Sequence, residues 1–180
     1  MCIRDSYYAV ISKTAEGCSS EALSNSVVLG PALDVPCEFP FDGNESMDIW
    51  TVIDANGNGS SWEWSDNSDG TLNGPSVIYD SDDYSADDWM ISPRINLEAG
   101  KTYLITFDAL SKDSNEDLLD VTLGKTTNTS EHKVVKTLSI TGADVANMEV
   151  TIPEIVESDS YRIGCLLYTS PSPRDGATSR

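Results

Sequence analysis

Acidic and amide side chains alternate along a short glycine-rich loop. Asp54, Asn56 and Asn58 place side-chain oxygens at every second position, and Gly57 and Gly59 permit a tight turn. Oxygen atoms gathered in a tight loop suit a hard cation such as calcium. The same Asn-Gly pattern also forms a β-turn without any metal. The loop alone therefore leaves both interpretations open.

Two adjacent carboxylates, Asp87 and Asp88, directly precede the apolar run Trp89-Met90-Ile91. Neighbouring residues of a strand point to opposite faces, so one of the two carboxylates must point inward. A buried carboxylate is costly unless a cation or a hydrogen-bond donor compensates its charge. The pair marks a second candidate cation position, and the alternative is a solvated turn.

A third acidic cluster contains Asp80, Asp82 and Asp83 next to Tyr79 and Tyr84. Carboxylates beside aromatic rings are suited to carbohydrate or protein contact, but such a run is more often a solvated loop.

Catalytic patterns are absent from the sequence. His132 is the single histidine, it lies in the polar stretch NTSEHKVV, and no GxSxG or HExxH motif occurs. We predict that His132 is a surface residue and that the chain is not an enzyme.

The charge of the chain disfavours some classes of binding partner. The 180 residues include 30 Asp and Glu against 11 Lys and Arg, which gives a net charge of -19. A strongly acidic chain is a poor ligand for nucleic acid or for anionic membrane surfaces. No apolar run approaches the ~20 residues that span a bilayer, so membrane insertion is not expected.

Short β-rich runs separated by turn residues predict an all-β chain with little helix. Trp50 and Trp89 lie in apolar strand contexts and are expected in the core, whereas Trp62 and Trp64 should share one strand face. The expected strands are 7–14, 25–30, 49–54, 75–80, 88–92, 102–109, 118–124, 134–140, 148–152 and 160–164.

Both ends differ in composition from the rest of the chain. Residues 1–6 and 165–180 look like translated sequencing-adapter artefacts, and we exclude them from fold reasoning. Cys2 and Cys165 fall in these ends. The remaining Cys18 and Cys37 could pair or stay free, and the sequence gives no geometry to choose between these states.

A domain boundary is expected at residues 31–36, because Pro31 and Pro36 cannot continue a central strand. Residues 7–30 before it resemble the last two strands of a fibronectin type III domain. The resemblance depends on Tyr8 and Val10 and on the run from Ser24 to Val27.

Residues 37–164 resemble the choice-of-anchor J or cleaved adhesin family, which includes adhesin regions of gingipain proteases. The motifs that carry this resemblance are Phe41-Asp42-Gly43, Trp50-Thr51, Asp54 to Gly59, Trp62, Ala86 to Pro93, Ile95-Asn96-Leu97, Gly100 to Tyr103 and Phe107-Asp108. The resemblance implies a jelly-roll β-sandwich whose closing strand begins at Tyr161 and is truncated after Gly164.

The resemblance also implies a structural Ca²⁺ ion that ties the N-terminal strand to a central one. Asp42 and one of the pair Asp87 and Asp88 would share this ion. Together with the resemblance, the glycine-rich loop adds Asp54, Asn56 and Asn58 as predicted calcium ligands.

The function implied is a non-catalytic, calcium-stabilised adhesion module of a larger bacterial protein, extracellular or at the cell surface, that contacts carbohydrate or an extracellular protein. Other domains of the parent chain would be its neighbours. The alternatives are an accessory domain of a secreted peptidase or glycosidase, and a structural spacer without a ligand.

Overall fold

The all-β prediction is confirmed in a computed structural model. The structure describes residues 30–67, 74–80, 86–111, 116–142 and 144–168, with the backbone alone at 9–13, 19–23 and 116. Within these residues the only helices are two short 3-10 turns, and none is long and apolar enough to cross a membrane. The elements are β1 (Ala9–Lys13), β2 (Ser19–Leu23), η1 (Asn44–Ile49), β3 (Thr51–Asp54), β4 (Trp62–Ser65), β5 (Ser76–Tyr79), β6 (Asp87–Ile91), β7 (Ile95–Leu97), β8 (Tyr103–Ala109), β9 (Glu116–Gly124), η2 (Thr129–Glu131), β10 (Lys133–Thr141), β11 (Ala146–Ile152) and β12 (Asp159–Tyr168).

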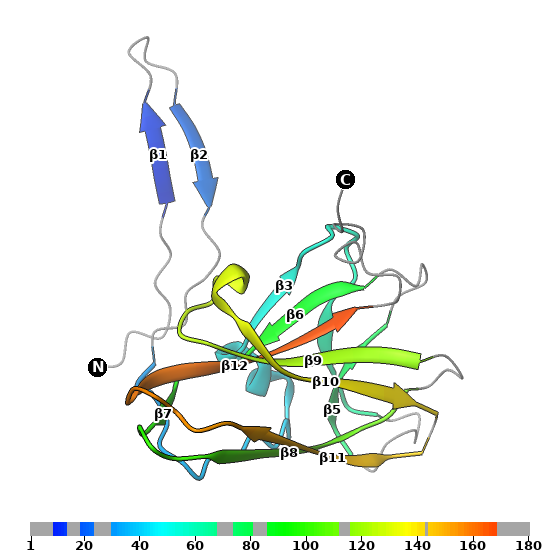
Figure 1. Ribbon diagram of the computed structural model, residues 1–180. Coiled ribbons are helices and arrows are strands. Elements are labelled where there is room, and N and C mark those ends of the chain that lie inside the picture. Colours follow the sequence, from blue (N-terminus) through cyan, green and yellow to red (C-terminus); the bar gives the residue numbers. More distant parts are fainter. Residues whose placement is uncertain are drawn as a thin grey trace, which may run out of the picture.

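The N-terminal strands form a hairpin of their own. β1 and β2 pair antiparallel, from Ala9 opposite Leu23 to Lys13 opposite Ser19, in a two-stranded sheet. Figure 1 shows this hairpin standing apart from the other strands. The expected strand 25–30 lies almost wholly outside the described residues, so the fibronectin resemblance stays a prediction.

The main sheet joins strands that are distant in the sequence. Its order is β10-β9-β12-β6-β3, with β7 paired to the beginning of β12, and every pairing is antiparallel. The C-terminal strand β12 therefore lies at the centre of the sheet, between β9 and β6 (Figure 1).

A second layer covers one face of this sheet. It contains the two-stranded sheets β8–β11 and β4–β5. Leu119 and Val121 of β9 meet Val150 of β11 in a buried cluster, against which Ile105 of β8 and Trp62 of β4 pack. Alternation of buried and exposed residues along β8 and β11 fits strands with one face on a core. The result is a jelly-roll β-sandwich.

The predicted linker 31–36 is part of this sandwich. Leu33 forms a parallel bridge with Ile95, and its backbone hydrogen bonds reach Arg94 and Asn96 at 2.8 Å each. The two prolines flank this contact and do not prevent it, because one bridging residue needs no extended strand. The segment is therefore fixed along the edge of β7.

The predicted domain end at Gly164 lies inside a strand. β12 continues to Tyr168, and Cys165 to Tyr168 pair with both β6 and β9. Leu166 is 2% exposed and packs with Trp89 and Ile91. Residues 165–168 thus contribute to the core, although they belong to the segment that was excluded from fold reasoning.

The tryptophan and cysteine predictions have mixed outcomes. Trp89 is 2% exposed, as predicted, whereas Trp50 is only half-buried and packs against Phe39 and Phe41 at ring distances of 5.0 and 5.5 Å. Cys37 is a free thiol, and Cys18 lies outside the described residues.

Candidate metal centre and ligand groove

The loop after β3 is organised around the carboxylate of Asp54. Its Oδ1 accepts a hydrogen bond from the Gly57 amide at 2.6 Å, and its Oδ2 accepts one from the Gly59 amide at 2.9 Å. Both glycines have positive φ angles, 72° and 86°, which this wrapping requires and which glycine adopts at low cost. The backbone amides of the loop therefore surround the carboxylate.

The two asparagine side chains of the loop also accept hydrogen bonds from backbone amides of the loop. Asn56 Oδ1 accepts from the Asn58 amide at 3.1 Å, and Asn58 Oδ1 accepts from the Ser60 amide at 2.8 Å. These are the turn interactions expected of Asn in a glycine-rich loop. The exposed part of the loop is thus held by its own amides in this structure.

Asp88 lies directly opposite Asp54 across the β3–β6 pair. It is fully buried, and its Oδ1 atom has no hydrogen-bond partner. Ser61 Oγ is likewise buried without a partner. Burial is the largest cause that raises the pKa of the Asp88 carboxyl, and the charge of Asp54 raises it further, while the Asp87 amide and the hydroxyls of Tyr79 and Ser61 offset part of the effect.

These neighbours form a polar position that lacks a positive charge. An orphaned carboxylate oxygen inside a fold is normally compensated by a donor or a cation. Asp88 and Asp54 supply carboxylate oxygens and Ser61 supplies a hydroxyl oxygen, which are ligand types that calcium accepts. The donor set therefore fits a calcium ion at this rung of the sheet.

The other predicted ligands lie elsewhere. Asp42 is exposed just before η1, and Asp87 is half-buried next to Asp88 but on the alternate side of β6. Across the described ranges, no three His, Cys, Asp or Glu side chains gather at one point suited to a metal. Of the predicted ligands, Asp54 and Asp88 thus lie opposite each other on one rung, with Asn56 and Asn58 in the loop that follows Asp54.

The predicted acidic and aromatic cluster is only partly described, because residues 81–85 lie outside the described ranges. Within it, the Tyr79 ring packs edge-on against Trp62 with ring centroids 6.0 Å apart. The Trp62 indole N–H donates to the Asp88 carbonyl at 3.1 Å, and the Trp64 indole N–H donates to the Phe41 carbonyl at 2.8 Å. These three rings serve packing between strands.

A groove of about 580 Å³ lies at one end of the sandwich, beside β7 and the beginning of β12. Its volume falls in the range of ligand sites, roughly 300–1,000 Å³. Six of its eight lining residues carry a carboxylate, amide or hydroxyl group, and two are aliphatic. The lining residues are Asp34, Val35, Asn96, Leu97, Glu98, Ser158, Asp159 and Ser160.

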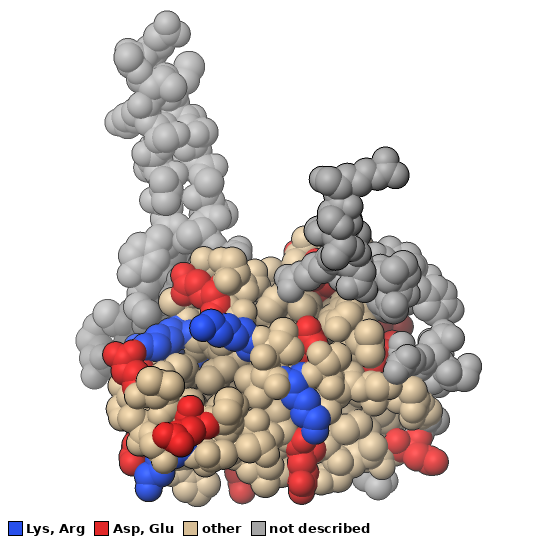
Figure 2. Space-filling model, in the orientation of Figure 1, with Lys and Arg blue, Asp and Glu red and all other residues tan. Residues whose placement is uncertain are grey.

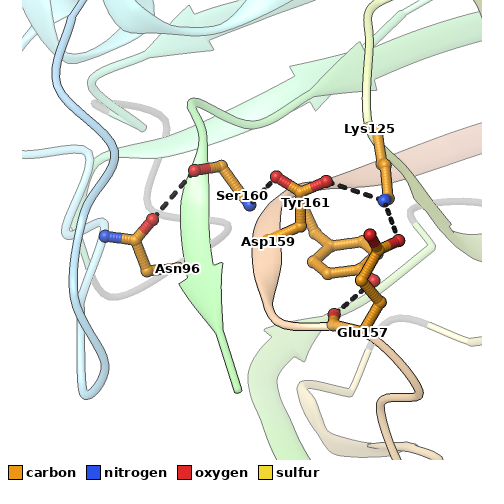
Figure 3. Close-up of polar contacts among 6 residues, drawn as sticks. All are labelled: Asn96, Lys125, Glu157, Asp159, Ser160 and Tyr161. Atoms are coloured by element: carbon orange, nitrogen blue, oxygen red, sulfur yellow. Dashed lines mark hydrogen bonds and ion pairs between the residues drawn. The ribbon is translucent and has the colours of Figure 1, made fainter. Parts of the chain in front are cut away.

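Hydrogen bonds fix the groove's polar groups in place (Figure 3). The Ser160 hydroxyl donates to Asn96 Oδ1 at 2.8 Å. The Asn96 amide in turn donates to Asp34 Oδ1 at 2.8 Å, which ties the segment after Leu33 to β7. A row of oriented polar atoms therefore crosses the groove from β12 to the N-terminal segment.

A charged network borders the groove (Figure 3). Lys125 Nζ lies 2.7 Å from Asp159 Oδ2 and 2.8 Å from Glu157 Oε2, and it sits over the Tyr161 ring, 5.4 Å from its centroid. The Tyr161 hydroxyl donates to the Glu157 carbonyl at 2.8 Å. Hydrogen bonds to Asp159 and then Glu157 raise the pKa of Lys125, and the hydrogen bond from Lys125 lowers the pKa of Asp159.

The sequence contains a pattern that indicates one wall of this groove. In the run from Arg94 to Glu98, polar residues alternate with Ile95 and Leu97, and the structure shows the polar ones exposed and the apolar ones 3% and 4% exposed. Such strict alternation predicts a polar row on one face of a strand. The partner residues on β12 depend on strand pairing, which alternation does not give.

Comparison with known proteins yields similarities of fold. The structure is similar to the K1 cleaved adhesin domain of Lys-gingipain from Porphyromonas gingivalis W83, with 16% identity over 69% of this chain and 91% of that chain and a TM-score of 0.47. It is also similar to a carbohydrate binding module from Cellvibrio mixtus lichenase 5A in complex with cellotriose, with 18% identity over 66% of this chain and 87% of that chain and a TM-score of 0.41.

A third similar structure is a glycoside hydrolase family 43 arabinoxylan arabinofuranohydrolase from Bacillus subtilis in complex with cellotetraose. Identity is 12%, 90% of this chain and 30% of that chain are covered, and the TM-score is 0.46. No family model and no curated protein matches the sequence. A cleaved adhesin domain, the kind of domain that the sequence motifs resemble, is thus among the similar folds.

Proposed function

We propose that this chain is a non-catalytic binding module that holds carbohydrate in the groove beside β7 and β12, within a larger extracellular or surface protein of a bacterium. The observation that carries this proposal is the groove itself. Its carboxylates accept hydrogen bonds from sugar hydroxyls, and its amide and hydroxyl groups both donate and accept. Val35, which is 41% exposed, adds apolar surface for the C–H face of a sugar ring.

The rigidity of the groove supports binding. Asn96 is held by Ser160 on one side and by Asp34 on the other, so its amide is oriented before a ligand arrives. Preorganised polar groups reduce the entropy that binding costs. Glu98 lines the same groove and leaves its carboxylate exposed for a ligand hydroxyl.

The environment of the single histidine supports a non-catalytic role. His132 Nε2 lies 2.9 Å from the Thr126 carbonyl and Nδ1 lies 2.9 Å from Thr122 Oγ1. Its ring also packs edge-on against Trp89 at 5.6 Å. Both ring nitrogens are thus engaged in local structure, and neither faces the groove residues.

We also propose that a structural calcium ion lies beside Asp88. The unpartnered Oδ1 atom of Asp88, the opposing carboxylate of Asp54 and the unpartnered hydroxyl of Ser61 support this position. When bound, the ion would neutralise two carboxylates that otherwise repel each other at one rung of the sheet. The remaining predicted ligands, Asp42, Asn56, Asn58 and Asp87, stay predictions.

Titration of the full chain with neutral oligosaccharides, followed by ¹H–¹⁵N NMR, tests the groove. We expect a saccharide to shift the amides of Asn96, Glu98 and Ser160, and Asn96→Ala to weaken its binding at least about 10-fold, since it removes two oriented hydrogen bonds. Thr106→Ala, an exposed change on β8, is the matched control and should bind like the wild type. Shifts elsewhere on the chain, or none in the panel, would contradict the proposal.

A further inference from the structure

Two arginines lie beside the groove, one position beyond the last pair of β7 and β12. Tyr161 pairs with Ile95 and Ser160 pairs with Asn96, so the next residues in register are Arg162 and Arg94. Side chains alternate along a strand, and Arg94 therefore shares a face with Asn96, as Arg162 does with Ser160. The two arginines extend the polar row of the groove by one rung.

Each guanidinium is anchored to a nearby carbonyl. Arg162 Nη1 donates to the Ser92 carbonyl and Arg94 Nη2 donates to the Gly30 carbonyl, both at 2.7 Å. A guanidinium carries five N–H donors, so most donors of each group remain for another acceptor. The anchors hold the planar groups in place without using up their hydrogen-bonding capacity.

No carboxylate of the described residues forms an ion pair with either arginine. Directly opposed like charges destabilise a strand pair, and their Cβ atoms lie only about 4.5–5.5 Å apart. Burial, and then the charge of Arg94, lower the pKa of Arg162. The arrangement is unusual in a chain with 30 acidic residues, which offers many possible partners.

We infer that Arg94 and Arg162 together bind a carboxylate, and that the groove therefore takes an acidic saccharide such as a uronic acid. This inference rests on the proposed carbohydrate function and specifies its ligand class. Two guanidiniums can hold a carboxylate through parallel N–H···O bonds, which adds directional specificity to the charge attraction. The hydroxyls of the same sugar would then reach Asn96 and Ser160 on the adjacent rung.

The net charge of -19 repels anions at long range, but it does not determine whether a carboxylate binds beside the two arginines. Figure 2 shows acidic side chains spread over the visible face and basic ones in few places. Exposed charges farther away than the screening length, about 8 Å at physiological ionic strength, act weakly on a bound group. Asp34, Glu98 and Asp159 line the groove itself, so the attraction for a carboxylate is confined to the rung of the two arginines, and the acidic surface disfavours long polyanions.

The groove's own lining is acidic, and the arginines lie beside it. Glu98 lines the groove together with Asp34 and Asp159, whereas Arg94 lies four residues from Glu98, about 13 Å along the chain. A saccharide with one carboxylate would have a single favoured direction in such a groove. A neutral saccharide would lack this orienting contact.

The test compares sodium glucuronate with glucose, which has the same ring but no carboxylate, by NMR titration of the full chain. We expect glucuronate to bind about 10-fold more tightly, and to shift the side-chain Nε–H signals of both arginines together with the Asn96 amide. Arg94→Gln should reduce the preference for glucuronate over glucose to less than about 2-fold. Lys136→Gln on β10, which removes the same charge away from the groove, should keep the preference.

The outcomes separate this inference from the proposed function. Equal binding of both sugars at Asn96 and Ser160 would overturn the arginine inference and leave the carbohydrate groove intact. Shifts confined to the arginines, also produced by sodium acetate with equal affinity, would overturn the acidic-sugar ligand in favour of a bare carboxylate site. If neither sugar shifts the amides of the groove, the result contradicts both the arginine inference and the proposed carbohydrate function. Because Arg162 is half-buried, the exposed Arg94 is the variant on which the test depends.

Discussion

Asp54 and Asp88 occupy the same rung of the β3–β6 pair, and the buried member of the pair has a carboxylate oxygen without a partner. Asp54 is stabilised by the loop amides that surround it, so the uncompensated charge belongs to Asp88. A cation bound by the folded chain alone would stabilise it by mass action.

We predict that millimolar calcium raises the melting temperature of the full chain relative to chelator, and that Asp88→Ala abolishes the rise. Asp108→Ala, which removes an exposed carboxylate on β8, is the control and should retain the response. Differential scanning calorimetry in calcium, magnesium and EDTA measures the effect. Superimposable melts of the wild type in calcium and EDTA would disprove the calcium site.

The strand beyond Gly164 gives a second prediction. Leu166 is 2% exposed in the cluster with Trp89 and Ile91, so Leu166→Ala should lower the free energy of unfolding by about 2–5 kcal/mol. Val156→Ala removes a side chain that is 95% exposed and should change it by less than about 0.5 kcal/mol. Denaturant titration provides both values, and an equal, small effect of the two changes would place residues 165–168 outside the folded domain.

Sequence patterns predicted the local features of this fold well. The alternation in Tyr103–Ala109 and the apolar run after Asp88 gave strands at their observed places, and the observation that one carboxylate of Asp87 and Asp88 must point inward identified a buried charge. These features depend on neighbours in the chain. Local pattern and local structure therefore agreed.

The features that local sequence patterns did not predict depend on pairing between distant strands. Composition separated residues 165–168 from the domain, but their apolar side chains complete a rung between β6 and β9. Likewise, Pro31 and Pro36 indicated a linker at 31–36, and the pattern did not reveal that Leu33 bridges to Ile95. The groove also arises from this long-range register, because it joins residues about 62 positions apart, such as Asn96 and Asp34.

His132 is a further departure from expectation, and it supports a third prediction. It was predicted to lie on the surface, but its ring packs over two glycines of the sheet. A Cβ atom at Gly124 would lie 2.6 Å from His132 Cδ2, and one at Gly164 would lie 2.5 Å from Thr122 Oγ1 and 2.9 Å from His132 Nδ1. The close approach of the ring therefore requires residues without side chains.

We predict that Gly124→Ala destabilises the fold by about 1–3 kcal/mol, the usual cost of overpacking. His132→Ala should cost less in the Gly124→Ala background than in the wild type, because removing the imidazole there also relieves its clash with the new methyl group. Gly30→Ala, where a Cβ meets nothing within 4 Å, is the control. Strict additivity of the two changes in a double-mutant cycle would show that the ring does not pack on this glycine.

The ion pair of Lys125 and Asp159 at the border of the groove should make the stability of the fold depend on pH. Lys125 lowers the pKa of the Asp159 carboxyl in the folded state. A depressed folded pKa means that the unfolded chain binds the proton more readily, so the contribution of Asp159 to stability is present above its unfolded pKa of about 3.9 and is lost as pH falls through the folded value. Because both groups are exposed, the effect should be small and sensitive to salt.

We therefore predict that Asp159→Asn lowers stability slightly at pH 6 and has no effect once the pH is well below the depressed pKa of Asp159. The melting-temperature difference between the variant and the wild type should shrink in 1 M NaCl, because salt screens the exposed ion pair. Asp108→Asn, which alters an exposed carboxylate that accepts from Asn147 and pairs with no lysine, serves as the control. A difference that is constant from pH 6 to pH 2 would mean that Asp159 acts through its backbone contact with Ser160 and not through the charge of Lys125.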